Sequence, residues 1–143
     1  MVRDGQLEPA TFVVMTNEPF ILTNASGVTY NVHLRFKEST QRNVGLAGAS
    51  PHNQKTILAA RSELFARVSE DLYRLNGYIC VVDNPFYVIA DAVGAFKLPD
   101  LPPGTYTIEV AHPRTGRVKR EITVSGASAT LNLEVPLKKP ITL

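Results

Sequence analysis

The sequence predicts an all-β sandwich, and three observations support this fold class. Apolar and polar residues alternate with a period of two, most clearly over residues 105–111, where Tyr106, Ile108 and Val110 share one face. Strong turn signals, such as the Pro-Pro-Gly run at 102–104, separate the alternating stretches. The 143 residues are 44% hydrophobic and 20% charged, which is typical of a chain that buries a core. This length suits one domain, or two small β units that share a core.

In the N-terminal half, three runs of β-branched, aromatic and aliphatic residues predict strands. They cover residues 12–15, 20–22 and 28–36. The last run has five apolar residues on one face: Val28, Tyr30, Val32, Leu34 and Phe36. Residues 39–53 are rich in Gly, Ser, Asn and Gln, which indicates a long surface loop or a weakly paired edge strand.

Residues 57–75 favour two different structures. Apolar residues recur at helical spacing, which indicates a short helix: Ile57, Leu58, Leu64, Phe65, Val68, Leu72 and Leu75. The start signal for a helix is weak, because Ser62 is not followed three residues later by an acidic residue. A short strand over residues 64–68 fits the same pattern, so helix and strand both stay open.

Six runs in the C-terminal half predict strands, and glycine and proline turns divide them. They cover residues 77–82, 86–90, 95–98, 105–111, 118–124 and 131–135. The first run is almost continuously apolar, which is typical of a buried strand. Pro136 and Pro140 end the pattern, so residues 138–143 are expected to form a tail.

Composition argues against several classes of function. The formal net charge is only +2 and the basic residues are scattered, which argues against nucleic-acid binding. The single cysteine, Cys80, lies in an apolar run and cannot form an internal disulfide, so we expect it in the core. No run approaches about 18 consecutive apolar residues, and no signal-peptide hydrophobic region follows Met1. We therefore expect a soluble chain that does not span a membrane.

The block of residues 77–91, continued by 94–96 and 101–107, resembles a known family. It is similar to bacterial exported cupredoxin-like proteins, of the plastocyanin-like or methylamine-utilisation type, joined to a carboxypeptidase-regulatory-like (transthyretin-like) β-sandwich. The resemblance implies an immunoglobulin-like or prealbumin-like fold, with a degenerate cupredoxin-like region at 1–75 and the carboxypeptidase-regulatory-like sandwich at 76–137. It also implies a periplasmic or extracellular location.

The run from Asn24 to His33 is similar to the copper-site strand of that family. Carried over position by position, the resemblance places the copper ligands on residues that do not supply blue-copper ligands: Tyr30, Ser69, Leu72 and Leu75. It therefore implies that the copper centre is lost, and we expect no metal or other cofactor. The alternative is an electron-transfer protein with an unconventional copper site, whose candidate ligands are His33, His52, His112 and Cys80.

The sequence offers no catalytic motif, so we expect a protein that is not an enzyme. Ser26, His33 and Asp91 are the residue types of a triad, but no serine lies in a Gly-x-Ser-x-Gly elbow. Asp83 and Asp91 flank a predicted turn, where capping of the local backbone is a simpler role than calcium binding.

These observations favour an interaction or structural module, a subunit of an exported or envelope protein assembly that can also self-associate through edge strands. Tyrosine and arginine are enriched at interface hot spots, and the candidate partner contacts are Tyr73, Arg74, Tyr87, His112 and Arg114. A carbohydrate-binding module is a second alternative, with Phe86 or Tyr87 as the stacking platform in a chain without tryptophan.

Overall fold

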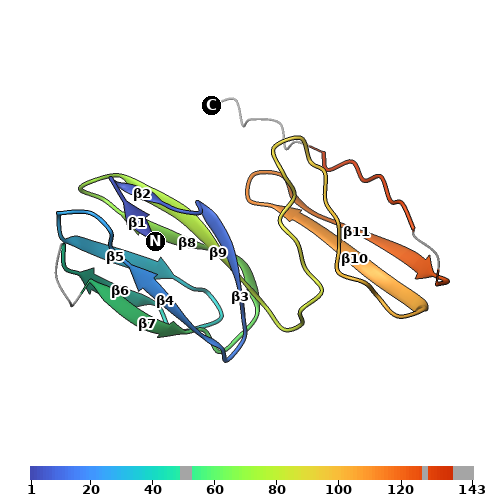
Figure 1. Cartoon of the computed structure of the whole chain (residues 1–143), viewed down its shortest axis with the longest axis horizontal. Helices are drawn as coiled ribbons and strands as arrows, with labels where there is room; N and C mark the ends of the chain where they lie inside the picture. Colours follow the sequence, from blue (N-terminus) through green and yellow to red (C-terminus); the bar gives the residue numbers. More distant parts are fainter. Residues whose placement is uncertain (49–52, 127–128, 137–143) are drawn as a thin grey trace. The chain divides into compact units, whose positions relative to one another are not determined.

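The computed structural model describes residues 1–48, 53–126 and 129–136. Every regular element in them is a β-strand, so the predicted all-β class is confirmed. None of these residues belongs to a helix of the length and apolarity that a membrane crossing needs. The chain divides into two compact units, residues 1–85 and 86–143, and Figure 1 shows the strands of each.

The first unit is built from strands β1 to β9. Their bounds are β1 Val2–Arg3, β2 Gln6–Leu7, β3 Thr11–Met15, β4 Pro19–Thr23, β5 Tyr30–Arg35, β6 Arg42–Leu46, β7 Gln54–Leu58, β8 Glu63–Glu70 and β9 Leu75–Val82. A five-stranded sheet has the order β3-β9-β8-β5-β6, in which β3 and β9 run parallel and the other neighbours antiparallel. Two further antiparallel pairs are β4 with β7 and β1 with β2.

The core of the first unit takes side chains from the five-stranded sheet and from both smaller pairs, as in a sandwich. The period of two seen in the sequence produces this arrangement. Along β5, Tyr30, Val32 and Leu34 are buried, whereas Asn31 and Arg35 are exposed on the other face. The predicted inward face of residues 28–36 is therefore confirmed from Tyr30 to Phe36, but Val28 precedes the strand and is exposed.

A tight hairpin of β1 and β2 packs against this core. Its two-residue loop is Asp4-Gly5, with φ angles of 48° and 77°, as a type I′ turn requires. The Gly5 N–H donates a hydrogen bond to the Tyr30 hydroxyl at 2.9 Å. On β9, a Cβ at Gly77 would lie 2.6 Å from the Ala10 carbonyl oxygen and 2.5 Å from the Leu7 Cδ2 atom, so a larger residue would force the backbone to shift.

The helix considered for residues 57–75 is not formed. Residues 63–70 are strand β8, which pairs with β5 on one side and β9 on the other. A β-bulge lies between Glu63 and Ala66, and Phe65 within it has a φ of 62°. The extra residue breaks the period of two, which is why the apolar spacing resembled a helix. Within the predicted loop or edge at 39–53, β6 forms an edge strand of the sheet, while residues 49–52 lie outside the described part.

The second unit contains one antiparallel hairpin, β10 (Gly104–His112) with β11 (Gly116–Val124). Pro113 opens its turn, which the Thr115 N–H closes on the His112 carbonyl at 3.3 Å, and Gly116 follows with a φ of 99°. The strands predicted for residues 86–90, 95–98 and 131–135 were wrong, because these segments pair with no strand in the described structure. Four prolines, at positions 85, 99, 102 and 103, lie outside these segments and lack the N–H donors with which regular pairing could continue through them.

The two units differ in the depth of their cores. Buried apolar residues end at Val81, and of the described residues 83–136 only Thr115 is buried. One interpretation of the sequence was a core shared by two small β units. In the structure, the core lies within the first unit. Strand β9 pairs with β3 and with β8 in that unit, so the division falls after Pro85 and not after residue 75. The predicted tail, 138–143, lies outside the described residues.

Candidate functional site

The four positions that the resemblance assigned to copper ligands do not converge on one site. Tyr30 and Leu75 are buried in the core at the start of β5 and β9. Ser69 is also buried but faces the other side of the sheet, where its Oγ accepts a hydrogen bond from the Arg35 Nε at 3.4 Å. Leu72 lies in the turn between β8 and β9 and is 77% exposed.

Tyr30 has a structural role in this arrangement. Its hydroxyl accepts the Gly5 N–H, and its ring packs edge-to-face on Tyr73 with centroids 5.0 Å apart. The buried ring therefore connects the first hairpin to the β8–β9 turn. A phenol held by these contacts contributes to folding through its packing and its hydrogen bond.

Asn24, the residue that opens the copper-like run, is fully buried and connects several segments. Its Nδ2 donates to the carbonyl oxygens of Val28 at 2.7 Å and of Leu46 and Ala47 at 3.1 Å each. Its Oδ1 accepts from the backbone N–H of Ser26 at 2.9 Å and from its hydroxyl at 2.8 Å. Its backbone exchanges two hydrogen bonds with Asn53, at 2.7 and 3.1 Å. One side chain thus fixes the end of β4, the following turn and the end of β6.

The residues of the triad considered from sequence have separate local roles. The Ser26 hydroxyl donates to Asn24 Oδ1, and His33 lies on the outward face of β5. Asp91 belongs to the second unit, where its Oδ1 accepts the N–H groups of Val93 at 3.0 Å and Ala95 at 2.8 Å. Asp83 accepts a hydrogen bond from its neighbour Asn84 at 3.1 Å. Both aspartates therefore bond groups close to them in sequence.

The described candidate ligands of an unconventional copper site belong to different elements of the chain. His33 on β5 and Cys80 on β9 have β8 between them in the sheet. The Nδ1 of His112 accepts the Arg114 N–H at 3.2 Å in the β10–β11 turn, and His52 lies outside the described residues. Within the described part of the chain, His, Cys, Asp and Glu residues form no group of three or more arranged to hold a metal ion.

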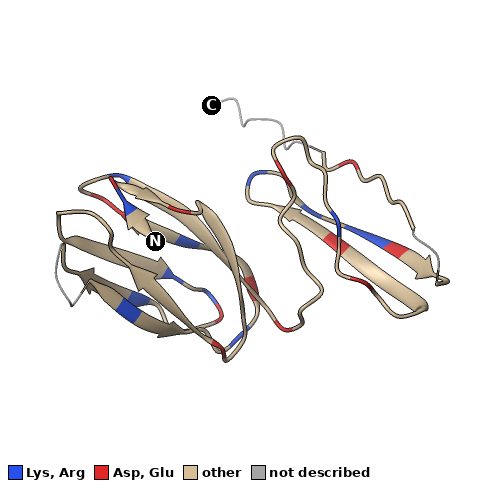
Figure 2. Cartoon of the chain, in the orientation of Figure 1, with Lys and Arg blue, Asp and Glu red and all other residues tan. Residues whose placement is uncertain are grey.

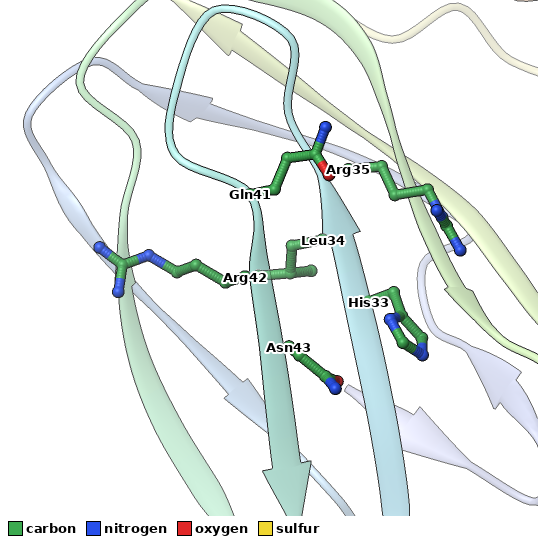
Figure 3. A pocket seen from close by; sticks show the side chains of 6 residues that line it. All are labelled: His33, Leu34, Arg35, Gln41, Arg42 and Asn43. Atoms are coloured by element: carbon green, nitrogen blue, oxygen red, sulfur yellow. The ribbon is translucent and has the colours of Figure 1, made fainter.

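The outward side of the five-stranded sheet carries two rows of polar residues, which we call the polar face. Cross-strand pairing places Asn43, His33, Ser69 and Asn76 in the first row, and Arg35, Arg67, Tyr78 and Thr11 in the second. A shallow hollow of about 220 Å³ lies at the β6 end of these rows, and Gln41 lines it beside Arg35. Figure 3 shows His33, Asn43, Arg35 and Gln41 on one side of the two strands, with the Arg42 side chain extending away from them.

No carboxylate in the described part of the chain forms an ion pair with the arginines of the polar face. Three ion pairs occur among the described residues, and none involves Arg35 or Arg67. The second unit differs, because β10 and β11 carry acidic and basic residues side by side (Figure 2). There Glu109 pairs with Arg117 at 3.2 Å and with Lys119 at 3.3 Å.

A second distinctive surface is a run of exposed apolar side chains in the second unit, which we call the apolar segment. It comprises Phe86, Tyr87, Val88, Ile89, Val93 and Phe96, each at least 36% exposed. Val93 is 88% exposed at the tip of the turn that Asp91 closes. Gly94, with a φ of 85°, allows that tight turn, and its N–H donates to the Asp91 carbonyl at 3.0 Å. The turn therefore exposes the apolar side chain of Val93, while hydrogen bonds to Asp91 hold its backbone in place.

The partner contacts predicted from sequence fall on different surfaces. Tyr73 and Arg74 are exposed in the β8–β9 turn of the first unit, where the Tyr73 N–H donates to Glu70 Oε2 at 2.7 Å. In the second unit, Tyr87 belongs to the apolar segment, whereas His112 ends β10 and Arg114 lies in the turn that follows.

Sequence reasoning missed both the polar face and Val93. Arg35 and Arg67 each lie between two buried residues, which is the signal of an outward position on a strand, but their adjacency depends on a pairing that the sequence does not state. Val93 follows Asp91 in a turn that was recognised, yet its exposure depends on how the turn closes.

Among known proteins, no family model, no curated protein and no solved structure matches this chain.

Proposed function

We propose that the chain is a non-enzymatic interaction module that binds another protein through the apolar segment of its second unit. The observation that carries the proposal is the apolar segment, whose six exposed side chains lie within residues 86–96, with Val93 88% exposed at the tip of a turn held by Asp91. Contiguous exposed apolar surface on a globular protein marks an interaction site more often than a single exposed side chain does.

The poor burial within the second unit supports this proposal. The hairpin of β10 and β11 has no further strand partner in the described structure, and its apolar face is only half-buried. An isolated two-stranded hairpin is marginally stable in water and gains stability when its apolar face is covered. A protein partner that binds the apolar segment would bury further apolar surface of this unit. By the family resemblance, the partner would be another subunit of an exported or envelope assembly.

Paired variants test the proposal. Val93→Asp and Ile89→Asp place a charge on the apolar segment, whereas Leu58→Asp places one on an exposed apolar residue of the first unit. Proteins retained from a host extract by the wild-type chain are identified by mass spectrometry, and the strongest one is purified and titrated. We expect each segment variant to weaken its binding about tenfold or more, since burial of one apolar side chain contributes about 1.5–3 kcal/mol.

Two controls make the result decisive. Leu58→Asp should bind like the wild type, and all variants should unfold within about 0.5 kcal/mol of it, as surface substitutions usually do. Sedimentation of the wild type and of Val93→Asp tests whether the partner is a second copy of the chain. A purified partner bound equally well by a Val93→Asp/Ile89→Asp double variant would show that the apolar segment is not the interface.

The two alternatives remain open to direct measurement. Copper titration followed by absorption and metal analysis tests the electron-transfer alternative, for which a thiolate charge-transfer band at stoichiometric copper is the expected signature. The carbohydrate alternative relies on Phe86 and Tyr87, which are 45% and 39% exposed. Glycan-array binding that is lost in Tyr87→Ala but kept in Val93→Asp would favour a sugar over a protein ligand.

A further inference from the structure

The pairing of β5 with β8 places two arginines directly opposite each other. Arg35 and Arg67 are cross-strand partners on the polar face. Side chains in such pairs have Cβ atoms about 4.5–5.5 Å apart, and like charges there destabilise a sheet. No carboxylate of the described residues forms an ion pair with either side chain. The repulsion between the two guanidinium groups is thus not offset by an acidic residue in the described structure.

Hydrogen bonds fix the inner end of each guanidinium group. The Nε of Arg35 donates to Ser69 Oγ at 3.4 Å, and the Nε of Arg67 donates to Asn76 Oδ1 at 3.0 Å. In both residues the terminal nitrogens make no hydrogen bond to any described residue, so their donors remain available. Two planar groups held in this way suit an oxyanion, since arginine binds carboxylate and phosphate oxygens in a bidentate manner.

Neutral hydrogen-bonding groups surround the arginine pair. His33 and Asn43 face each other across β5 and β6, and Gln41 lines the same hollow as Arg35. Figure 3 shows these side chains on the side of the strands that carries Arg35. The rows of the polar face contain no acidic residue. The face therefore combines positive charge with several polar side chains, as recognition of a small anion requires.

We propose that the polar face binds an oxyanion, a carboxylate or a phosphate, between Arg35 and Arg67, with His33 and Asn43 beside it. The anion would neutralise the opposed charges and satisfy the terminal guanidinium donors. This site belongs to the first unit and is independent of the apolar segment. A negative result for this site would therefore not contradict the proposed interaction with a protein partner.

The test is a titration of the full chain with inorganic phosphate and, separately, with glutarate, at constant ionic strength with chloride as the reference anion. Amide and arginine Nε resonances report the location of binding, and their shifts give the dissociation constant. We expect shifts on β5 and β8, and a loss of affinity of about tenfold or more in Arg35→Gln and in Arg67→Gln, because each removes charged hydrogen bonds. Lys55→Gln is the control, since Lys55 is exposed on β7, which pairs with β4 outside the five-stranded sheet.

Each outcome of these titrations either supports or overturns the proposed oxyanion site. Saturable binding of phosphate alone, of glutarate alone or of both supports the site and identifies its preferred oxyanion. Absence of saturable shifts with both probes overturns the proposal, as does an equal loss in Lys55→Gln, which would indicate diffuse attraction by positive charge. Without an added oxyanion, Arg67→Gln should unfold at the same temperature as the wild type or higher, because it removes the repulsion. Clear destabilisation there would contradict the argument from opposed charges.

Discussion

The side chain of Asn24 gives the sharpest prediction about stability. It is fully buried, and its two Nδ2 hydrogens are shared among three carbonyl oxygens. Asn24→Ala leaves the buried Leu46 carbonyl without this donor, and an unpaired buried acceptor costs about 1–3 kcal/mol. The other side-chain bonds, to Val28, Ala47 and Ser26, are partly exposed, and water replaces them at a cost of about 0.5 kcal/mol each. The expected loss is therefore about 4 kcal/mol, out of a usual total of about 5–15 kcal/mol.

Urea unfolding at pH 7, followed by tyrosine fluorescence, measures this loss. With a slope near 2 kcal/mol per molar urea, the midpoint should fall by about 2 M. Asn43→Ala is the matched control, because Asn43 is exposed on β6 and its removal should change stability by at most about 0.5 kcal/mol.

Asn24→Asp is a second test of how much the buried hydrogen bonds of Asn24 contribute to stability. Aspartate has the same shape, but it replaces the Nδ2 donor with an oxygen that faces three carbonyl oxygens. We expect it to destabilise the protein at least as much as alanine does. A loss below 1 kcal/mol in Asn24→Ala, or an aspartate variant of near wild-type stability, would show that the buried hydrogen bonds contribute little.

Three further predictions concern the fold of the first unit. A fragment of residues 1–85 should fold alone, with cooperative unfolding by circular dichroism, whereas residues 1–75 should not, because that fragment lacks β9. Gly77→Ala should cost about 1–3 kcal/mol in urea unfolding, because its Cβ would overlap the Ala10 carbonyl oxygen of the backbone as well as the Leu7 side chain; an unchanged midpoint would contradict the close packing. Tyr30→Phe should cost about 1 kcal/mol through loss of one backbone-to-hydroxyl hydrogen bond, and the amide exchange of the first hairpin should accelerate.

The sequence predicted strands best where a period of two coincides with pairing to a neighbouring strand. Residues 30–35 and 104–112 became β5 and β10 with the expected faces. Alternation alone was not sufficient in the second unit, because it describes which face a residue takes and not whether a neighbouring strand exists. Residues 131–135 keep the alternation of half-buried and exposed side chains, yet pair with no described strand.

Other features depended on information that local patterns do not contain. The bulge at Phe65 prevented β8 from being recognised in the sequence, since one extra residue converts the strand period of the apolar residues into an apparent helical period. By contrast, Asp4-Gly5 is a strong hairpin signal that sequence reasoning overlooked. Arg35 and Arg67 are far apart in the chain, so the polar face followed only from the register of β5 on β8.

The parallel pairing of β3 with β9 also has a consequence for synthesis on the ribosome. Thr11 pairs with Tyr78, which is 67 residues later in the chain. At about 5–20 residues per second, several seconds pass between the synthesis of the two strands. During that time the Phe12 and Val14 side chains of β3 lack their neighbours on β9. The nascent chain thus carries an early strand that must avoid other partners until β9 emerges, and its first unit can complete its sheet only then.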